Sequence, residues 1–213
     1  LLPYYSYAIP TLAFIFGFSA VVLACSLARI RGGFSTVTVI LAGVIVAAIF
    51  TALLSIVKFI SDPYRLSGIV FWTMGGFYKA SWDYLLLAAP GSVTGLTILF
   101  FLRWRLNVLS MGDEEAKLMG VNVYHERLLV LISATLACAS VISVSGIVAW
   151  VGLIVPHIVR SLVGSDNKYL IPASAAFGAS ILVLTDDLCR SLFSFEIPIS
   201  IVTTLVAAPY FIY

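Results

Sequence analysis

The stretch LAGVIVAAIFTALLSIV, residues Leu41–Val57, contains no charged side chain and no regular alternation of apolar and polar residues. A strand of a membrane-spanning barrel would alternate over about 10 positions. Lipid offers the backbone no hydrogen-bond partners, so a segment that crosses a bilayer must satisfy its own peptide groups. The stretch therefore predicts an α-helix that spans a membrane.

The rest of the chain repeats this pattern. Runs without Asp, Glu, Lys or Arg occupy residues 1–28, 32–57, 84–102, 128–159, 169–185 and 197–213. A spanning helix needs about 20 mostly apolar residues. Of the 213 residues, 62% are apolar and 10% are charged, whereas a soluble domain has about 25% charged residues. We predict an all-α polytopic membrane protein whose residues 1–213 form a single transmembrane domain.

These runs predict about seven transmembrane helices. Two come from the long run 128–159, and the other five are expected near Tyr7–Ala28, Thr36–Ile60, Tyr84–Leu102, Leu170–Leu184 and Ile197–Tyr213. Residues 66–78 are also apolar, but they are too few to span a bilayer. They predict an interfacial or re-entrant helix with Gly75 and Gly76 at its end.

The run 128–159 has two interpretations. As a single helix it would be about 48 Å long, against a hydrocarbon core of about 30 Å. Alternatively, it contains a full span, a break near Ser145 and Gly146, and a short return helix. Pro156 could bend or end that helix, because proline lacks a backbone N–H.

The distribution of Lys and Arg favours the broken form, because these residues concentrate on the cytoplasmic side of membrane proteins. With the break, eight fall inside and four outside; without it, the count is seven against five. The eight inside residues are Arg29, Arg31, Arg103, Arg105, Lys117, Arg127, Arg160 and Lys168. The four outside residues are Lys58, Arg65, Lys79 and Arg190.

The longest polar stretch, Arg103–Arg127, contains a short predicted helix between Gly112 and Gly120. Its first turn is acidic, which complements the helix dipole, and Gly120 is placed to end it. The acidic residues are Asp113, Glu114 and Glu115, and a small apolar face is predicted from Ala116, Leu118 and Met119. The segment is either a solvated loop helix or a helix that docks in a groove of a cytoplasmic partner.

Two further polar groups have both a structural and a functional interpretation. Pro156, His157 and Arg160 lie at the inner end of the fifth span, where we expect a structural role rather than a proton relay or a ligand. The outer group is Asp186, Asp187, Arg190 and Glu196. Asp186 and Arg190 are spaced to pair on one helix face, or the group contacts a molecule that arrives from outside.

Several function classes lack the residues that they need. No predicted span carries a lone ionisable residue at its centre, which argues against an ion-coupled secondary transporter. There is no pair of catalytic groups at membrane depth for an intramembrane enzyme, and no P-loop for an ATPase. The net charge of +2 is too small to suggest nucleic acid. Cys25 and Cys138 lie in apolar runs and are expected to be buried, so we predict no disulfide, metal site or cofactor.

Several stretches resemble one family in its own order. The longest are LSMGDEEAKLMGV (Leu109–Val121), SGIVAWVGLIVPHIVRSLVG (Ser145–Gly164) and EIPISIVTTLVAAPYFIY (Glu196–Tyr213); the shorter ones are LAGV (Leu41–Val44) and FWTMGGF (Phe71–Phe77). They are similar to the FecCD-type permeases of type II ATP-binding cassette (ABC) importers, which carry cobalamin, ferric siderophores, haem or molybdate. The family has Gly where this chain has Ser200 and Ala207, which we expect to change packing mildly.

The resemblance implies the transmembrane permease subunit of an importer, not an enzyme, in the cell (inner) membrane. It implies a homodimer in membrane lipid, two ABC subunits that hydrolyse ATP, and an extracytoplasmic substrate-binding protein. The cargo would be a metal chelate or an oxyanion, and the motifs do not say which. The family has about ten spans, and this chain resembles its C-terminal part, so the first three helices are expected to be missing from it.

The resemblance also implies roles for particular residues. Coupling to the ATPase falls on Gly112, Asp113, Glu114, Glu115, Ala116 and Gly120. Ser35 and Thr36 match a cytoplasmic gate, although Ser and Thr also suit the N-cap of the second span. Arg190 matches an arginine that docks on a glutamate of the binding protein. The structural motif residues are Gly146, Gly152, Pro156, His157, Arg160, Pro198 and Pro209.

Overall fold

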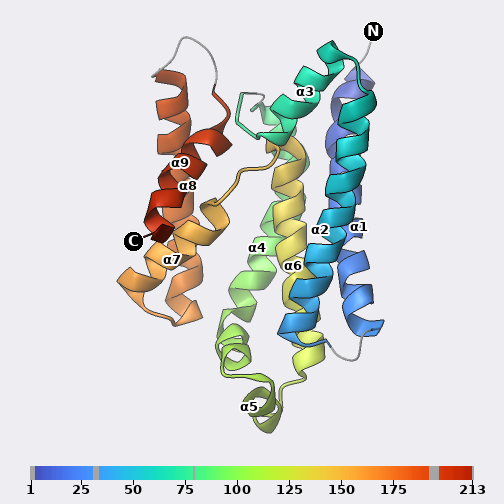
Figure 1. Ribbon diagram of the computed structural model, residues 1–213. Coiled ribbons are helices and arrows are strands. Elements are labelled where there is room, and N and C mark those ends of the chain that lie inside the picture. The colour runs from blue at the N-terminus through green and yellow to red at the C-terminus, as the bar shows by residue number, and fades with distance from the viewer. Residues whose placement is uncertain (1–2, 31–33, 79, 192–196, 213) are drawn as a thin grey trace.

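The computed structural model describes residues 3–30, 34–78, 80–191 and 197–212, and every regular element within them is a helix (Figure 1). The helices are α1 (Pro3–Ile30), α2 (Thr36–Ile60), α3 (Pro63–Thr73), α4 (Trp82–Ser110), α5 (Asp113–Leu118), α6 (Val123–Ser145), α7 (Val151–Val163), α8 (Asn167–Ser191) and α9 (Ile199–Ile212). Of these, α1, α2, α4, α6 and α8 are long and apolar enough to cross a membrane, while α7 and α9 are shorter apolar helices. The prediction of an all-α polytopic membrane protein is confirmed.

The limits of the helices differ from the prediction where charged residues follow an apolar run. The second span has the predicted limits, but α4 continues through the two arginines 103 and 105 to Ser110. Arginine favours helix, and its long side chain reaches water from just beyond the hydrocarbon. The run without charges therefore marks the lipid-buried part of a helix and not its end. Three residues used in the sequence predictions, Arg31, Lys79 and Glu196, lie outside the described residues.

The break in the run 128–159 is confirmed. α6 ends at Ser145 and α7 begins at Val151. Gly146 has a φ of 71° and Trp150 a φ of 68°, both in the left-handed region, so the intervening backbone cannot continue a right-handed helix. Pro156 lies inside α7 and does not end it, because α7 continues to Val163.

Two glycines explain why the chain breaks at this point. The loop after α3 packs its backbone directly on the backbone that follows α6. A side chain at Gly75 would overlap the carbonyl of Ile147, and one at Gly146 would overlap the carbonyl of Trp72. The Gly76 N–H donates to the Ser145 carbonyl at 2.8 Å. Only glycine permits this approach of two backbones.

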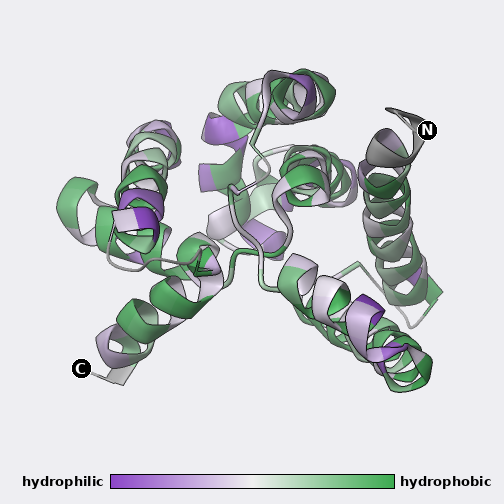
Figure 2. Cartoon of the chain, turned by 90° about the horizontal axis from the view of Figure 1, so that it is seen from above, coloured by the Kyte–Doolittle hydropathy of each residue, from purple (hydrophilic) through white to green (hydrophobic). Residues whose placement is uncertain are grey.

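The helices form two groups (Figure 1). In one group, α4 and α6 cross closely at Gly95, which has no side chain. A Cβ atom at this position would lie 2.5 Å from the Ser133 carbonyl oxygen and 2.7 Å from the Ala137 nitrogen. Small residues at such a crossing are typical of helix packing in membranes. In the other, α7, α8 and α9 share a core of Ile154, Val155, Val159, Leu170 and Ala207. Figure 2 shows apolar residues along the sides of the helices, as expected in lipid.

Candidate functional site

The short helix α5 protrudes at one end of the molecule, between α4 and α6 (Figure 1). It begins after Gly112, whose φ is 121°. It ends in a pair of hydrogen bonds, from the Val121 N–H to the Ala116 carbonyl at 3.1 Å and from the Gly120 N–H to the Lys117 carbonyl at 2.9 Å. This is a Schellman motif. The predicted role of Gly120, with a φ of 77°, as the end of the helix is confirmed.

One side of α5 is fastened to the rest of the molecule and the other is free. Ala116 has an exposed fraction of 0% and packs with Val108 and Val123. Leu118 and Met119 are 89% and 59% exposed. The prediction that Ala116 shares an apolar face with these two residues is wrong, because Ala116 alone is buried against Val108 and Val123. Leu118 lies two positions on, on the opposite side of the helix, and Met119 is the C-cap, beyond the last helical residue.

Arg127 on α6 connects α5 to a distant part of the chain. Its Nη2 lies 2.6 Å from Oδ1 of Asp113, and its Nη1 lies 3.4 Å from Oδ2 of the same carboxylate. Nη1 also donates to the backbone carbonyl of Phe34. The hydrogen bond from Arg127 is the main reason that the pKa of Asp113 lies below its ordinary value. Asp113 is therefore ionised at neutral pH and the pair is charged.

The junction before α2 lies at the same end as α5 (Figure 1). Ser35 is the N-cap of α2, and its Oγ accepts a hydrogen bond from the Thr38 N–H at 3.2 Å. The predicted N-cap role of Ser35 is thus confirmed. Thr36 is the first residue of the helix, and both side chains are exposed. A hydroxyl at this point can line an aqueous opening while it also caps the helix.

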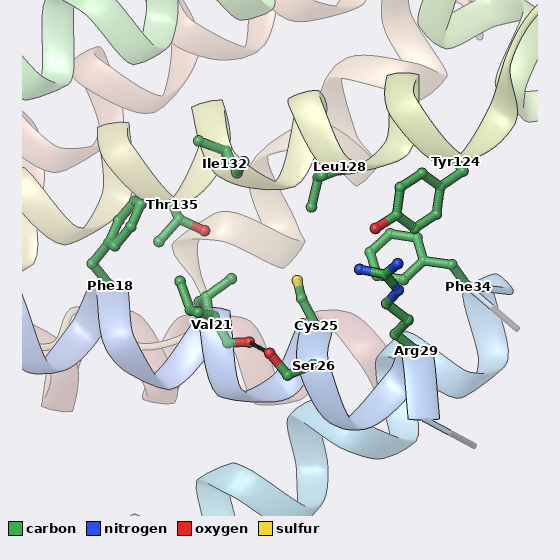
Figure 3. Close-up of a pocket in the computed structure, with 11 residues that line it drawn as sticks. Phe18, Val21, Cys25, Ser26, Arg29, Phe34, Tyr124, Leu128, Ile132 and Thr135 are labelled. Atoms are coloured by element: carbon green, nitrogen blue, oxygen red, sulfur yellow. Dashed lines mark hydrogen bonds between the residues drawn. The ribbon is translucent and has the colours of Figure 1, made fainter. Parts of the chain in front are cut away.

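An apolar pocket of about 270 Å³ lies between α1 and α6, beside this junction (Figure 3). Phe34 and Tyr124 meet edge to face at its end, with ring centroids 5.0 Å apart. Arg29 lies beside them, and the rest of the lining is mainly aliphatic and aromatic. Such a lining suits an apolar occupant. Among the described residues no group of three or more His, Cys, Asp or Glu could hold a metal ion.

At the opposite end, Arg190 forms the predicted pair on α8. Its Nε lies 2.9 Å from Oδ2 of Asp186, and its Nη2 donates to the Phe77 carbonyl at 3.1 Å. Its side chain keeps an exposed fraction of 47%. Asp187 is exposed and Glu196 lies outside the described residues. The arginine is held against the loop after α3 while part of its guanidinium faces solvent.

The remaining predicted structural residues lie around the joint between α7 and α9. The Nδ1 of His157 lies 2.9 Å from the Tyr210 hydroxyl. The Arg160 carbonyl accepts from Gly164 N–H at the end of α7. Pro198 is buried just before α9, and its carbonyl accepts from the Ile201 N–H. Pro209 lies inside α9, and Gly152 has open space around it.

The model of the FecCD transport family matches residues 2–213, nearly the whole chain. The chain belongs to the FecCD transport family. The molybdate import system permease protein of Haemophilus influenzae is 39% identical over 206 residues, which cover 96% of this chain and 61% of the relative. The hemin transport system permease protein of Yersinia pestis is 36% identical over 176 residues, 82% of this chain and 52% of the relative.

Solved structures agree with this family assignment. A structure described as an inward-facing conformation of a metal-chelate type ABC transporter superposes with a TM-score of 0.83 at 39% identity. The match covers 95% of this chain and 70% of that chain. The chain thus spans 47% to 63% of the length of these and other curated relatives.

Sequence reasoning missed several polar contacts of this FecCD chain. Asn107 on α4 donates to Asp166 at 2.7 Å and accepts from the backbone of Asn167 at 2.9 Å, which joins α4 to the start of α8. No local sequence pattern predicts the contacts of Arg127 and Asn107, because their partners lie up to 93 positions away along the chain. The hydroxyl of Ser200, for which the sequence predicted only a mild packing change, donates to the Ile147 carbonyl at 2.7 Å. The three cysteines are free, and Cys138 is exposed, contrary to prediction.

Proposed function

We propose that this chain is part of the membrane-spanning permease subunit of an ABC importer, and that the importer carries a metal chelate or an oxyanion across the cell membrane. The observation that carries the proposal is the geometry of α5. Ala116 and Asp113 hold this helix against α4 and α6, while Glu114, Leu118 and Met119 are exposed. A short helix held in this way suits docking in a groove of an ATPase subunit.

The proposal includes partners that supply what this chain lacks. ATP hydrolysis belongs to two ABC subunits, since the sequence contains no P-loop. A second copy of the chain forms the other half of the pathway, and an extracytoplasmic binding protein delivers the cargo. Relatives named as permeases for molybdate, hemin and cobalamin support a metal-containing or anionic cargo. The ionisable groups of two spans lie near their ends: Glu126 and Arg127 near the start of α6, and Asp186 and Arg190 near the end of α8. Such groups at membrane depth would mark an ion pathway or a proton relay, so their position supports a carrier that ATP drives.

The test is reconstitution of the full-length protein with the ATPase and the binding protein encoded beside its gene. Proteoliposomes are offered molybdate, a ferric siderophore, haem or cobalamin as separate probes. ATP-dependent accumulation of one of them supports the proposal. Uptake that follows an ion gradient without ATP would instead support an ion-coupled secondary transporter.

Ser35 and Thr36 form the cytoplasmic gate of this proposed importer. Their exposure at the α5 end supports this placement, and the N-cap role of Ser35 does not exclude it. Single cysteines at 35 or 36 are expected to crosslink two copies of the full-length protein in one nucleotide state and less in another. If neither position crosslinks in any nucleotide state, the gate lies elsewhere.

A structural role is proposed for Pro156, His157 and Arg160, together with Gly146, Gly152, Pro198 and Pro209. The contact between His157 and Tyr210 joins α7 to α9 and supports this interpretation. A metal site at His157 would require further His, Cys, Asp or Glu side chains beside it. Among the described residues, no cluster of metal-binding side chains includes His157.

A further inference from the structure

A single guanidinium contacts the two segments to which the proposed function gives different tasks. Arg127 contacts α5 through Asp113 with both terminal nitrogens, at 2.6 Å and 3.4 Å. It contacts the junction before α2 through the carbonyl of Phe34. The side chain is only 13% exposed. The charge is thus largely shielded from solvent, where such contacts are stronger than at a surface.

The geometry of arginine suits this double contact. Its planar fork presents five N–H donors at fixed angles, so one carboxylate and one carbonyl can be bound together without loss of either contact. Phe34 is held to α6 a second time, by the edge-to-face contact of its ring with Tyr124. Phe34 directly precedes Ser35, the N-cap of α2. A shift of α5 relative to α6 would therefore act on the residue that precedes the gate.

We propose that Arg127 is a positioning residue that couples the position of α5 to the conformation of residues 34–36. This inference rests on the proposed function, in which α5 docks on the ATPase and Ser35 and Thr36 form the gate. When nucleotide moves α5, the carboxylate of Asp113 moves the guanidinium, and the guanidinium moves the carbonyl of Phe34. The link needs both contacts, since loss of either separates the ATPase side from the gate side.

The chain contains a matched control, an ion pair whose carboxylate is the residue before Arg127. Arg105 on α4 pairs with Glu126 on α6, one residue before Arg127. Both arginines join a cytoplasmic helix end to α6 through a carboxylate. The described contacts of Arg105 include no atom of residues 34–36. Removal of Arg105 therefore tests the loss of an interhelix ion pair without loss of the proposed link.

The experiment measures gate movement rather than transport, so the cargo need not be known. The full-length protein, with its native cysteines replaced by alanine, carries one spin label at Val37, which is 66% exposed. It is assembled with its ATPase subunits in nanodiscs. The distance between the labels of two copies is measured without nucleotide and with ATP plus vanadate. The ATPase rate is measured on the same samples.

In the wild type, nucleotide is expected to shift the label distance. Arg127→Ala and Asp113→Asn are each expected to reduce that shift about threefold or more. In Arg127→Ala, which leaves the docking helix α5 unaltered, the ATPase rate should stay within about twofold. The double variant should be no worse than the more severe single one, because the two residues act in one link. Arg105→Ala is expected to retain the shift, even where it lowers the melting temperature.

Three outcomes would contradict the proposals: the first concerns the proposed function, and the other two concern only the link. If the wild type binds no ATPase subunit or shows no shift with nucleotide, the proposed function fails. If the wild type shifts and Arg127→Ala shifts equally, only the link fails. An equal loss in Arg105→Ala and Arg127→Ala also overturns it, because general destabilisation of the helix ends would then explain the result.

Discussion

The two ends of the molecule are held together by different interactions. At the α5 end, charged and polar side chains connect segments that are distant in sequence, such as Arg127 with Phe34 and Asn107 with Asp166. At the α3 end, the connection is made by backbone, where Gly75 and Gly146 approach each other without side chains. Arg190 adds an ion pair within its own helix there, and one side-chain hydrogen bond to the carbonyl of Phe77.

This difference has a mechanical meaning. A long side chain can change rotamer or exchange partners at modest cost, so an end joined by such contacts can move and still remain connected. Two backbones in direct contact have no such freedom, because any rotation causes overlap. We therefore expect the α3 end to stay rigid while the α5 end responds to a partner. The predictions below test this comparison from the largest effect to the smallest.

The rigid end should tolerate no side chain at its glycine contact. In Gly146→Val the new side chain would overlap the Trp72 carbonyl, and the φ of 71° adds strain. We expect loss of folded protein or destabilisation by about 3 kcal/mol or more. The yield of monodisperse full-length protein in detergent and its melting temperature measure this. Gly152→Ala is the control, since a methyl group there meets nothing within 4 Å; wild-type behaviour of both variants would refute the rigid contact.

The two sides of α5 should respond differently to substitution. Glu114 is 85% exposed and pairs with Lys117, so Glu114→Lys should change stability by less than about 1 kcal/mol yet reduce transport per ATP about tenfold. Ala116 is fully buried, so Ala116→Leu should reduce transport per ATP and, in addition, lower the free energy of unfolding by about 1–3 kcal/mol. The melting temperature and the ratio of transport to ATP hydrolysis are measured together. Normal coupling in both variants would exclude α5 as the docking helix.

Arg190 should act in binding rather than in stability. We expect Arg190→Glu to weaken association with the binding protein about tenfold at low salt and less at high salt, because a charge at an interface rim acts mainly on association. Binding is measured by surface plasmon resonance on the reconstituted complex, with basal ATPase activity unchanged. Arg65→Glu at the same end is the control, because Arg65 is 86% exposed and pairs with Asp62. Unchanged affinity in Arg190→Glu would leave only its pair with Asp186.

Ser200, at the start of α9, adds a side-chain contact to the loop between α6 and α7, which is otherwise held by backbone contacts at Gly146. Its hydroxyl donates to Ile147 and accepts from the Ala149 N–H at 3.1 Å. Ser200→Ala should lower the free energy of unfolding by about 1–2 kcal/mol, which corresponds to a fall of about 2–8 °C in melting temperature. Ser180→Ala, whose hydroxyl bonds within its own helix, should change less. If both variants lower the melting temperature equally, the contacts of Ser200 with the loop between α6 and α7 do not contribute to stability.

The smallest expected effect is the pH dependence at the α5 end. The hydrogen bond from Asn107 lowers the pKa of Asp166 from its ordinary value of 3.8, and the Lys168 N–H lowers it further. A carboxyl group with a lowered folded-state pKa contributes stability above its ordinary pKa and loses it as the pH falls through the folded-state value. Wild-type melting temperature should therefore fall more below pH 3.8 than that of Asn107→Ala. Parallel melting curves of the two proteins against pH would contradict this.

The helices were predictable because hydrophobic length is a local property. The run Leu41–Val57 alone requires a spanning helix, and α2 begins and ends where the sequence predicted. The ends of α4 were not predictable in the same way. Arg103 and Arg105 mark the edge of the lipid-buried part, while the helix continues to Ser110 because the residues from Arg103 to Ser110 include no Gly or Pro.

The candidate site was predictable in part. Gly120 ends α5 by a motif within a few residues, and Ser35 caps α2 through a neighbour three positions away, so sequence alone indicated both. The orientation of α5 was not indicated. Ala116 is buried because α4 and α6 cover it, and the sequence of α5 contains no information on which side they lie.

By itself, the sequence determined that this protein is helical, lies in a membrane, and belongs with the FecCD permeases, because apolar runs and short motifs act over a few neighbouring residues. Only the tertiary structure showed that the break near Ser145 packs against the loop after α3, and which residues Arg127 connects. The physical reason is distance along the chain. A guanidinium binds whichever carboxylate and carbonyl the packed helices bring within about 3 Å, and the carbonyl of Phe34 lies 93 positions away in sequence.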